Sequence, residues 1–271
     1  MSLAGKTIAL GITGGVAAYR ACDLIRELYR RGVARVLVCM TPEASAFITP
    51  LTLESLSGYP VWQSVTSVPA WPFLSGISKP LSVPGHIWLA QQADALVILP
   101  ATANIMAKLA YGQADCPISL TAVTMTGKPI LVMPAMNTRM WLNPATKRNV
   151  KLLQDTLDVT IIPPSDGLLA CGETGAGHLA PDAFLMSYLE RALYEAPGAL
   201  HGVRALVTAG GTQEPLDAVR VLTNRSSGKM GLAMADALFA AGASVTLLTS
   251  QTPIPIRPYQ LTAFKTSREL A

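Results

Sequence analysis

The sequence contains few charged residues. Aspartate, glutamate, lysine and arginine make up 14% of the 271 residues, and 50% of the chain is hydrophobic. Average globular chains carry roughly 25% charged residues, so this scarcity indicates that much of the surface is hidden between subunits. The net charge of +4 is mild and the basic residues are scattered. The chain therefore lacks the electrostatic footprint of a nucleic-acid-binding protein, and no nucleic-acid partner is expected.

Long apolar runs are also missing. No run reaches the roughly 18 residues that a membrane helix needs, so no membrane partner is expected. The chain has four cysteines, Cys22, Cys39, Cys116 and Cys171. They form no CxxC motif and follow no regular spacing, which is typical of a reduced, cytoplasmic protein. The histidines lack the carboxylate or cysteine spacing of a zinc site, so no metal is predicted.

Short β-branched runs alternate with helical stretches over the first 160 residues or so of the sequence. Buried strands are predicted at residues 7–12, 36–40, 95–99, 130–133 and 159–162. After the first strand, apolar side chains recur at helical spacing up to Gly32. Near-continuous apolar strands separated by helices predict an α/β fold, a doubly wound parallel sheet covered on both faces. In such a fold ligands bind where strands end and helices begin.

A domain boundary is expected near the sequence EAPGALHG. The predicted first domain covers residues 1–192, a linker covers 193–202, and a partial second α/β domain covers 203–271. In the second domain, strands are predicted at 203–208 and 244–249 around a helix at 230–241. Residues 64–85 contain four prolines and no acidic residue, and a long surface loop leading to His86 is expected there.

The segment GITGGVAA joins the first predicted strand to the first helix. Its glycines, Gly11, Gly14 and Gly15, allow a tight turn and the close approach of a phosphate to a helix N-terminus. They do not form a GxGxxG motif, and no acidic residue follows the second strand, so a mononucleotide fits better than a dinucleotide. The alternative is a plain tight turn.

Two further segments follow predicted strands directly. In PATAN, Pro100 is expected to end the strand, and Thr102 and Asn104 lie at the next helix start, where they can cap the helix or bind phosphate. In PAMNTRMW, Asn137 can hydrogen-bond a carboxylate or an amide, and Met136, Met140 and Trp141 can wall a pocket. The alternatives are simple capping, core methionines and an ordinary turn asparagine.

A thiol and an imidazole complete the candidate chemistry. The segment GLLACGETGAG places glycines on both sides of Cys171, which indicates a mobile flap carrying one thiol; the alternative is a buried structural cysteine. His86 stands at a predicted helix start, where it can act as a general base, orient a substrate, or be merely structural. In the second domain, Ser226, Ser227 and Lys229 suit a nucleotide phosphate, although no Walker A motif is present.

Taken together, these segments resemble a known family. Residues 1–192 are similar to the homo-oligomeric flavin-containing cysteine decarboxylases, which have a flavodoxin- or Rossmann-like flavoprotein fold. The similarity extends to bifunctional bacterial enzymes of coenzyme A biosynthesis, which join phosphopantothenoylcysteine decarboxylase to phosphopantothenate–cysteine ligase. Residues 203–271 resemble the start of the ligase half, through VTAGGTQEPLDAVRVLTNRSSGKMG. The nucleotide-binding strands and catalytic lysine of that half follow later in the family, so no ligase activity is expected from this chain alone.

The resemblance implies FMN as cofactor and decarboxylation of 4′-phosphopantothenoylcysteine to 4′-phosphopantetheine as the reaction. The implied cofactor-binding residues are Thr13, Gly14, Gly15, Thr41, Phe47, Thr102, Ala103 and Asn104. The implied catalytic residues are His86, Asn137 and Cys171, and the implied substrate-binding residues are Ala135, Asn137 and Met140. Cys171 would donate a proton to the reduced intermediate. The family's flavin site lies between subunits, which implies a trimer or a dodecamer.

The chain departs from the family pattern at three places, one of which is the loop at 64–85, which is longer and less acidic than is usual in the family. Cys116 follows Asp115 where an acidic pair is usual, and His178 and Leu179 stand where Arg-Met is usual. Two other flavin proteins remain as alternatives: a flavin-binding regulatory subunit without decarboxylase activity, and an enzyme similar to flavin prenyltransferases. A redox-independent nucleotide-binding module is the third alternative.

Overall fold

The computed structural model describes residues 3–67, 69, 84–156, 159–169, 172–193, 199–251 and 257–271. Most of the loop predicted at 64–85 lies outside the described residues, and so does Cys171. The chain divides into two compact units, Met1–Leu185 and Met186–Ala271. No described helix has both the length and the apolar character required to cross a bilayer.

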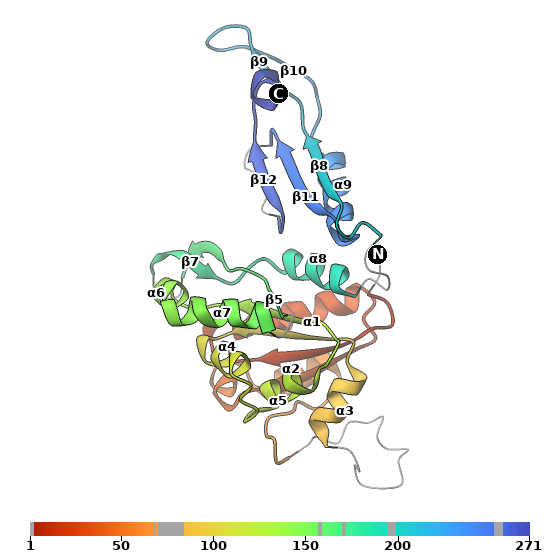
Figure 1. The fold of residues 1–271 in the computed structure, drawn as a ribbon, viewed down its shortest axis with the longest axis vertical. Helices are drawn as coiled ribbons and strands as arrows, with labels where there is room; N and C mark the ends of the chain where they lie inside the picture. The colour runs from red at the N-terminus through yellow and green to blue at the C-terminus, as the bar shows by residue number, and fades with distance from the viewer. Residues whose placement is uncertain are drawn as a thin grey trace. The chain divides into compact units, whose positions relative to one another are not determined.

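A five-stranded parallel sheet forms the centre of the first unit (Figure 1). Its strands are β1 (Thr7–Ile12), β2 (Arg35–Met40), β3 (Ala95–Ala101), β4 (Ile130–Pro134) and β5 (Val159–Ile161). They stand in the order β2-β1-β3-β4-β5, so the predicted doubly wound sheet is confirmed. Because the strand order reverses between β1 and β3, a crevice is expected at the carboxyl ends of these two strands.

Helices cover both faces of this sheet. They are η1 (Val16–Tyr19), α1 (Arg20–Arg30), η2 (Pro42–Ala46), α2 (Pro50–Ser57), α3 (Gly85–Gln92), α4 (Ala103–Ala110), α5 (Pro117–Thr124), α6 (Thr138–Leu142) and α7 (Pro144–Thr156). Side chains of α3, α4, α5 and α7 share one buried cluster with Leu96 and Ile98 of β3. Helices α1 and α2 contact each other and β2. All residues of β1, β3 and β4 are buried, as expected for strands covered on both faces.

One local expectation needs correction. Pro100 does not end β3, which continues to Ala101 and pairs there with Pro134 of β4. A proline lacks only the N–H donor, and the carbonyl of Pro100 still accepts a hydrogen bond, from Thr13. The segment around Cys171, which the sequence predicts to be a mobile flap, contains an antiparallel hairpin of β6 (Ser165–Leu168) and β7 (Thr174–His178). We call residues 165–169 and 172–178 the β6–β7 hairpin.

The second unit contains a smaller parallel sheet. Its elements are β8 (Arg204–Ala209), β9 (Gln213–Pro215), β10 (Val221–Thr223), α9 (Lys229–Ala240), β11 (Ser244–Thr249), β12 (Gln260–Ala263) and α10 (Ser267–Leu270). The sheet order is β12-β11-β8. Leu247 of β11 and Phe239 of α9 lie in its buried core, and α8 (Asp182–Ala192) adds Tyr188, whose ring meets Phe239 edge-on at 5.3 Å.

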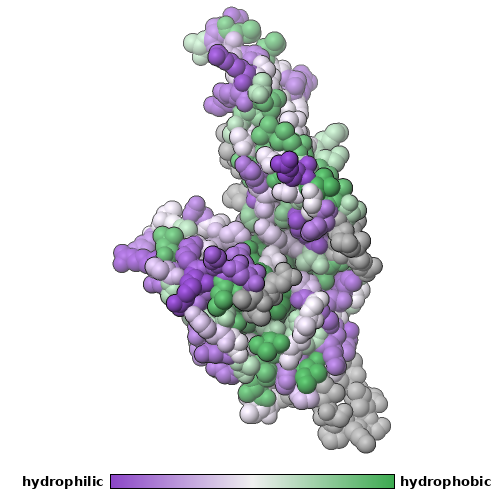
Figure 2. Space-filling view, viewed as in Figure 1, coloured by the Kyte–Doolittle hydropathy of each residue, from purple (hydrophilic) through white to green (hydrophobic). Residues whose placement is uncertain are grey.

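Large apolar side chains remain exposed on this second unit, and Figure 2 shows hydrophobic residues interspersed with hydrophilic ones on its visible surface. Leu206, Leu222, Met230 and Met234 are each more than half exposed. Extensive exposed apolar surface usually marks a contact site.

Candidate active site

The buried hydroxyl of Thr13 joins the carboxyl ends of β1 and β3. Its Oγ1 donates to the carbonyl of Pro100 at 2.5 Å and accepts from the backbone N–H of Thr102 at 3.2 Å. The glycine turn after β1 and the PATAN segment, far apart in sequence, therefore meet at the point where the sheet order reverses. The sequence predicts both segments at one sheet edge but does not show this link.

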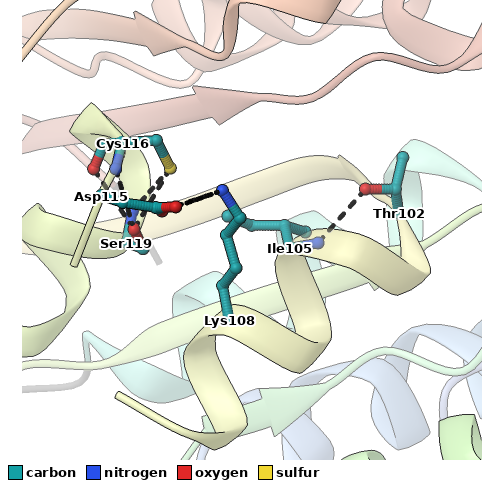
Figure 3. A network of polar contacts seen from close by, with 6 residues as sticks. All are labelled: Thr102, Ile105, Lys108, Asp115, Cys116 and Ser119. Atoms are coloured by element: carbon teal, nitrogen blue, oxygen red, sulfur yellow. Dashed lines mark hydrogen bonds and ion pairs between the residues drawn. The ribbon is translucent and has the colours of Figure 1, made fainter. Parts of the chain in front are cut away.

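The N-terminus of α4 lies at the same edge. Thr102 is the N-cap of α4, and its Oγ1 accepts from the N–H of Ile105 at 3.4 Å (Figure 3). Ala103 and Asn104 form the start of α4, where Asn104 is exposed. The first N–H groups of a helix have no partner within the helix and bind phosphate well.

A cavity of about 620 Å³ opens beside these groups. The volume lies within the range that small-molecule and cofactor sites show. Its lining combines the glycine turn, the start of α1, the turn before α6 and the β6–β7 hairpin. Of the predicted site residues, those that line it are Gly14, Gly15, Thr102, Ala135, Asn137 and Met140. Met136 also lines it, whereas Trp141 is buried in the core.

The glycine turn leaves space on the cavity side. A Cβ added to Gly15 would lie 3.7 Å from Pro100 Cγ and 3.8 Å from Thr102 Cγ2, which is ordinary contact. Thr41 is buried at the N-cap of η2, and Phe47 is 48% exposed at its end. Neither Thr41 nor Phe47 lines the cavity. Helix η2 nevertheless lies against the glycine turn, since a Cβ on Gly14 would meet Glu43 Cβ at 2.6 Å.

Asn137 is held in a defined orientation. It is the N-cap of α6, and its Oδ1 accepts from the N–H of Arg139 at 2.8 Å. Its Nδ2 donates to Oε2 of Glu173 at 3.3 Å. Since the oxygen is engaged by the helix, the amide presents its NH₂ group to a ligand acceptor, as carboxylate binding requires.

The β6–β7 hairpin is docked closely on the turn before α6. The N–H of Met136 donates to the carbonyl of Gly177 at 3.0 Å. A Cβ on Gly175 would lie 2.6 Å from Thr138 Oγ1, and a Cβ on Gly177 would collide with the carbonyl oxygen of Met136. The glycines of this segment are therefore required for packing, a role that the sequence alone does not reveal.

A Gly177→Ala substitution tests this packing. Gly177 has φ +135°, which disfavours any side chain, in addition to the collision. Overpacking of this kind costs about 1–3 kcal/mol, and we expect an undocked hairpin and a lower melting temperature. Gly172→Ala is the matched control, because Gly172 has φ +82° but open space around its Cβ position. Equal melting temperatures for the two variants would contradict the docking role.

The sequence does not predict the two basic residues that line the cavity, Arg20 and His178. Arg20 Nη2 lies 3.0 Å from Asp182 Oδ2. Burial lowers the pKa of Arg20, but the hydrogen bond and charge of Asp182 outweigh it, so the pKa is raised. Its Nε is buried without a hydrogen-bond partner among the described residues. The Nδ1 of His178 lies 2.9 Å from the carbonyl oxygen of Leu179. Arg20 thus places a buried N–H donor at the cavity, while Asp182 balances its charge.

His86 is not brought to this cavity within one chain. It is the second residue of α3, and its carbonyl accepts from Thr124 Oγ1 at 3.5 Å. The end of α3 is fixed by Lys128, whose Nζ donates to the carbonyls of Ala90 and Ala93, each at 2.7 Å. In Figure 1, α3 lies well away from α6 and β7. His86 and Asn137 therefore do not face the same cavity of a single chain.

The unusual Asp115–Cys116 pair has a structural explanation (Figure 3). Cys116 is the N-cap of α5: its Sγ accepts from the N–H of Ser119 at 3.5 Å, and its own N–H donates to Ser119 Oγ at 3.3 Å. Asp115 Oδ1 accepts from Lys108 Nζ at 2.8 Å, and this hydrogen bond lowers the pKa of Asp115. The thiol thus takes the capping position that polar side chains usually fill.

The described residues offer no metal site, and the second unit contains a cavity of its own. Among the described residues, no group of three or more histidine, cysteine and acidic side chains could hold a metal ion. In the second unit, Ser226, Ser227 and Lys229 line a cavity of about 760 Å³ together with Gly210. The sequence predicts a nucleotide phosphate there.

Comparison with protein-family models gives two matches. The model described as Flavoprotein matches residues 1–193. The model described as DNA/pantothenate metabolism flavoprotein C-terminal domain matches residues 200–271.

Curated proteins match over nearly the whole chain. The sequence is 40% identical over 259 residues to the coenzyme A biosynthesis bifunctional protein CoaBC of Escherichia coli strain K12, covering 96% of this chain and 60% of that protein. It is 42% identical over 260 residues to CoaBC of Mycolicibacterium smegmatis, covering 94% of this chain and 59% of that protein. The chain therefore spans about three fifths of the length of these relatives.

Solved structures match the first part of the chain. A cysteine-to-serine variant of PPC decarboxylase complexed with pantothenoylaminoethenethiol is 30% identical, with a TM-score of 0.57 over 68% of this chain and 96% of that chain. The FMN binding protein AtHal3 is 32% identical, with a TM-score of 0.52 over 68% and 94%. The FMN-dependent cysteine decarboxylase SpaF is 28% identical, with a TM-score of 0.58 over 71% and 97%.

Proposed function

The chain belongs to the flavoprotein family, and from this premise we propose that it is an FMN-dependent carboxy-lyase. The proposed reaction converts 4′-phosphopantothenoylcysteine into 4′-phosphopantetheine in coenzyme A biosynthesis. The observation that carries the proposal is the cavity at the ends of β1 and β3, where Thr13 ties the glycine turn to the start of α4 and where Asn137 presents its amide. The names of the CoaBC and PPC decarboxylase relatives support the substrate.

The residues present fit FMN. Gly15 leaves space beside the cavity, and α4 begins at the same edge, so the glycine turn and Thr102–Asn104 would hold the phosphate. Thr41 and Phe47 remain predicted contacts of the cofactor. When bound, FMN supplies the two-electron oxidation of the cysteinyl group and the later return of hydride.

The protein's own groups would then position and protonate the substrate. The amide of Asn137 holds the substrate's carboxylate, with Ala135 and Met140 alongside. The apolar side chains of Met136, Met140 and Leu169 line the cavity and favour the loss of a charged carboxylate as neutral CO₂, because they solvate charge poorly. His86 acts as base or orients the substrate, and Cys171 donates the final proton.

We further propose that the working unit is a homo-oligomer, a trimer or a dodecamer built from trimers. Since His86 does not reach the cavity of its own chain, a second copy would supply it. The cavity rim supports this reading, because Val16 and Tyr19 are each 58% exposed and Leu168 is 69% exposed. These three side chains line one cavity, and apolar groups gathered at one exposed place usually mark a contact site. Free Cys22, Cys39 and Cys116 support a reducing, cytoplasmic location.

Purified protein tests the proposal directly. We expect a yellow protein whose released ligand has the mass of FMN, and CO₂ release when phosphopantothenoylcysteine is added. FMN without CO₂ release would instead favour a flavin-binding regulatory subunit. FAD, NAD or no nucleotide in correctly folded protein would overturn the cofactor assignment, and light scattering that shows an active monomer would overturn the oligomer.

A further inference from the structure

The amide that is proposed to hold the substrate's carboxylate already donates to a carboxylate of the chain itself. Asn137 Nδ2 lies 3.3 Å from Glu173 Oε2, and Arg139 Nη2 lies 3.7 Å from Glu173 Oε1. The Glu173 carboxylate thus lies between an amide donor and a guanidinium. These are the partners that a substrate carboxylate would take at the same place.

The backbone of the β6–β7 hairpin brings Glu173 to this position. The N–H of Leu169 donates to the carbonyl of Glu173 at 2.8 Å, and Gly177, four residues further on, is bonded to Met136 beside Asn137. The side chain itself is held weakly, because Glu173 is 48% exposed and Arg139 is 88% exposed. Exposed ion pairs contribute little, so a competing carboxylate can displace this one.

We propose that Glu173 is a specificity-determining residue that favours substrate or product differently. Its carboxylate accepts the hydrogen bond of the Asn137 amide until the substrate's carboxylate displaces it. This inference rests on the proposed function, since it takes Asn137 as the group that holds the substrate. The binding of substrate and the binding of product are affected differently by this exchange. The substrate carries the displacing carboxylate, whereas the decarboxylated product does not, so Glu173 returns to Asn137 once CO₂ has left. Glu173 therefore opposes the binding of the substrate but not the binding of the product.

The test is the Glu173→Gln variant, which keeps the length of the side chain and removes its charge. The measurements are KM and kcat for CO₂ release from phosphopantothenoylcysteine, and the inhibition constant of 4′-phosphopantetheine. Weakening a competitor that accepts from Asn137 and forms an exposed ion pair with Arg139 is expected to lower KM about 3- to 10-fold. The inhibition constant of the product should stay the same, and Glu173→Asp should restore a KM closer to wild type.

Asp166→Asn provides the matched control. Asp166 is exposed on β6 of the same hairpin and pairs with Ala176, so its replacement removes the same charge without touching Asn137. We expect a wild-type KM for this variant. The proposal is overturned if Glu173→Gln leaves KM unchanged, if substrate and product affinities shift together, or if Asp166→Asn lowers KM equally.

Failure of the proposed function gives a different result. Wild-type protein that holds FMN but releases no CO₂ contradicts the proposed reaction, whatever the variants do. Titration calorimetry with phosphopantothenoylcysteine and 4′-phosphopantetheine then decides the role of Glu173. Tighter binding of only the first compound to Glu173→Gln supports the carboxylate exchange, and any other result overturns it.

Discussion

The His86→Asn variant is expected to keep its FMN and its melting temperature while CO₂ release falls about 10²–10⁴-fold, the usual contribution of a positioned acid–base group. Asparagine can replace a hydrogen bond of the imidazole but cannot take up a proton near neutral pH. Flavin content is expected to be unaffected because His86 lies on α3, outside the cavity that Gly15, Thr102 and Asn137 line. Absorbance, thermal unfolding and turnover are measured on the same preparation.

A complementation experiment tests whether His86 acts on a neighbouring copy. Asn137→Ala should also retain FMN and lose turnover, because the carboxylate of the substrate then has no amide to bind. When both variants are expressed together, hybrid oligomers contain some sites with His86 from one chain and Asn137 from the other. Partial recovery of CO₂ release is the expected result. A structural role predicts that turnover falls only in proportion to lost flavin or lost fold, and confirmed hybrids without recovery would place His86 in its own chain's site.

The strands of the first unit could be predicted because burial on both faces leaves a direct mark on the sequence. The strand predicted at residues 7–12 coincides with β1, all of whose residues are buried. The predicted end of β3 was wrong by two residues because Pro100 has no N–H to donate but its carbonyl still accepts a hydrogen bond. Its carbonyl is bonded by Thr13, 87 positions earlier in the chain, and no local pattern records that contact.

The candidate site was predictable only in part. The motifs correctly indicate that the turns after β1, β3 and β4 lie at one edge, since parallel strands share their carboxyl ends. They do not show that Arg20 and His178 line the same cavity, because this depends on how closely the β6–β7 hairpin approaches the turn before α6.

The motifs also group His86 with Asn137, although the fold of one chain separates them. Sequence similarity identifies the residues of a site but does not identify the copy of the chain that contributes each residue.

Cys116 illustrates how a departure from a family pattern can be structural. Its thiol takes part in the reciprocal cap of α5 with Ser119, so replacement by serine should preserve the cap. This makes Cys116→Ser a matched control for the other cysteine that the sequence singles out, Cys171. Both substitutions exchange a sulfur for an oxygen, but only one concerns the predicted proton donor.

The Cys171→Ser variant is expected to retain FMN and to release CO₂, yet to stall before the final reduction. A thiol has an ordinary pKa of about 8.5, whereas a serine hydroxyl is a far weaker acid, so the proton that must accompany the returning hydride is no longer delivered. Product formation should fall about 10²–10⁴-fold. The oxidised enethiol form of the substrate should therefore accumulate.

Single-turnover mass spectrometry distinguishes the two steps, because the enethiol is two hydrogens lighter than 4′-phosphopantetheine. In Cys171→Ser the lighter compound should persist and the heavier one should be nearly absent, while Cys116→Ser should form the heavier compound at the wild-type rate. Normal product formation by Cys171→Ser would show that Cys171 is a structural cysteine. Loss of CO₂ release together with loss of product would instead place Cys171 in the oxidative step or in the fold, and circular dichroism with flavin content separates those two outcomes.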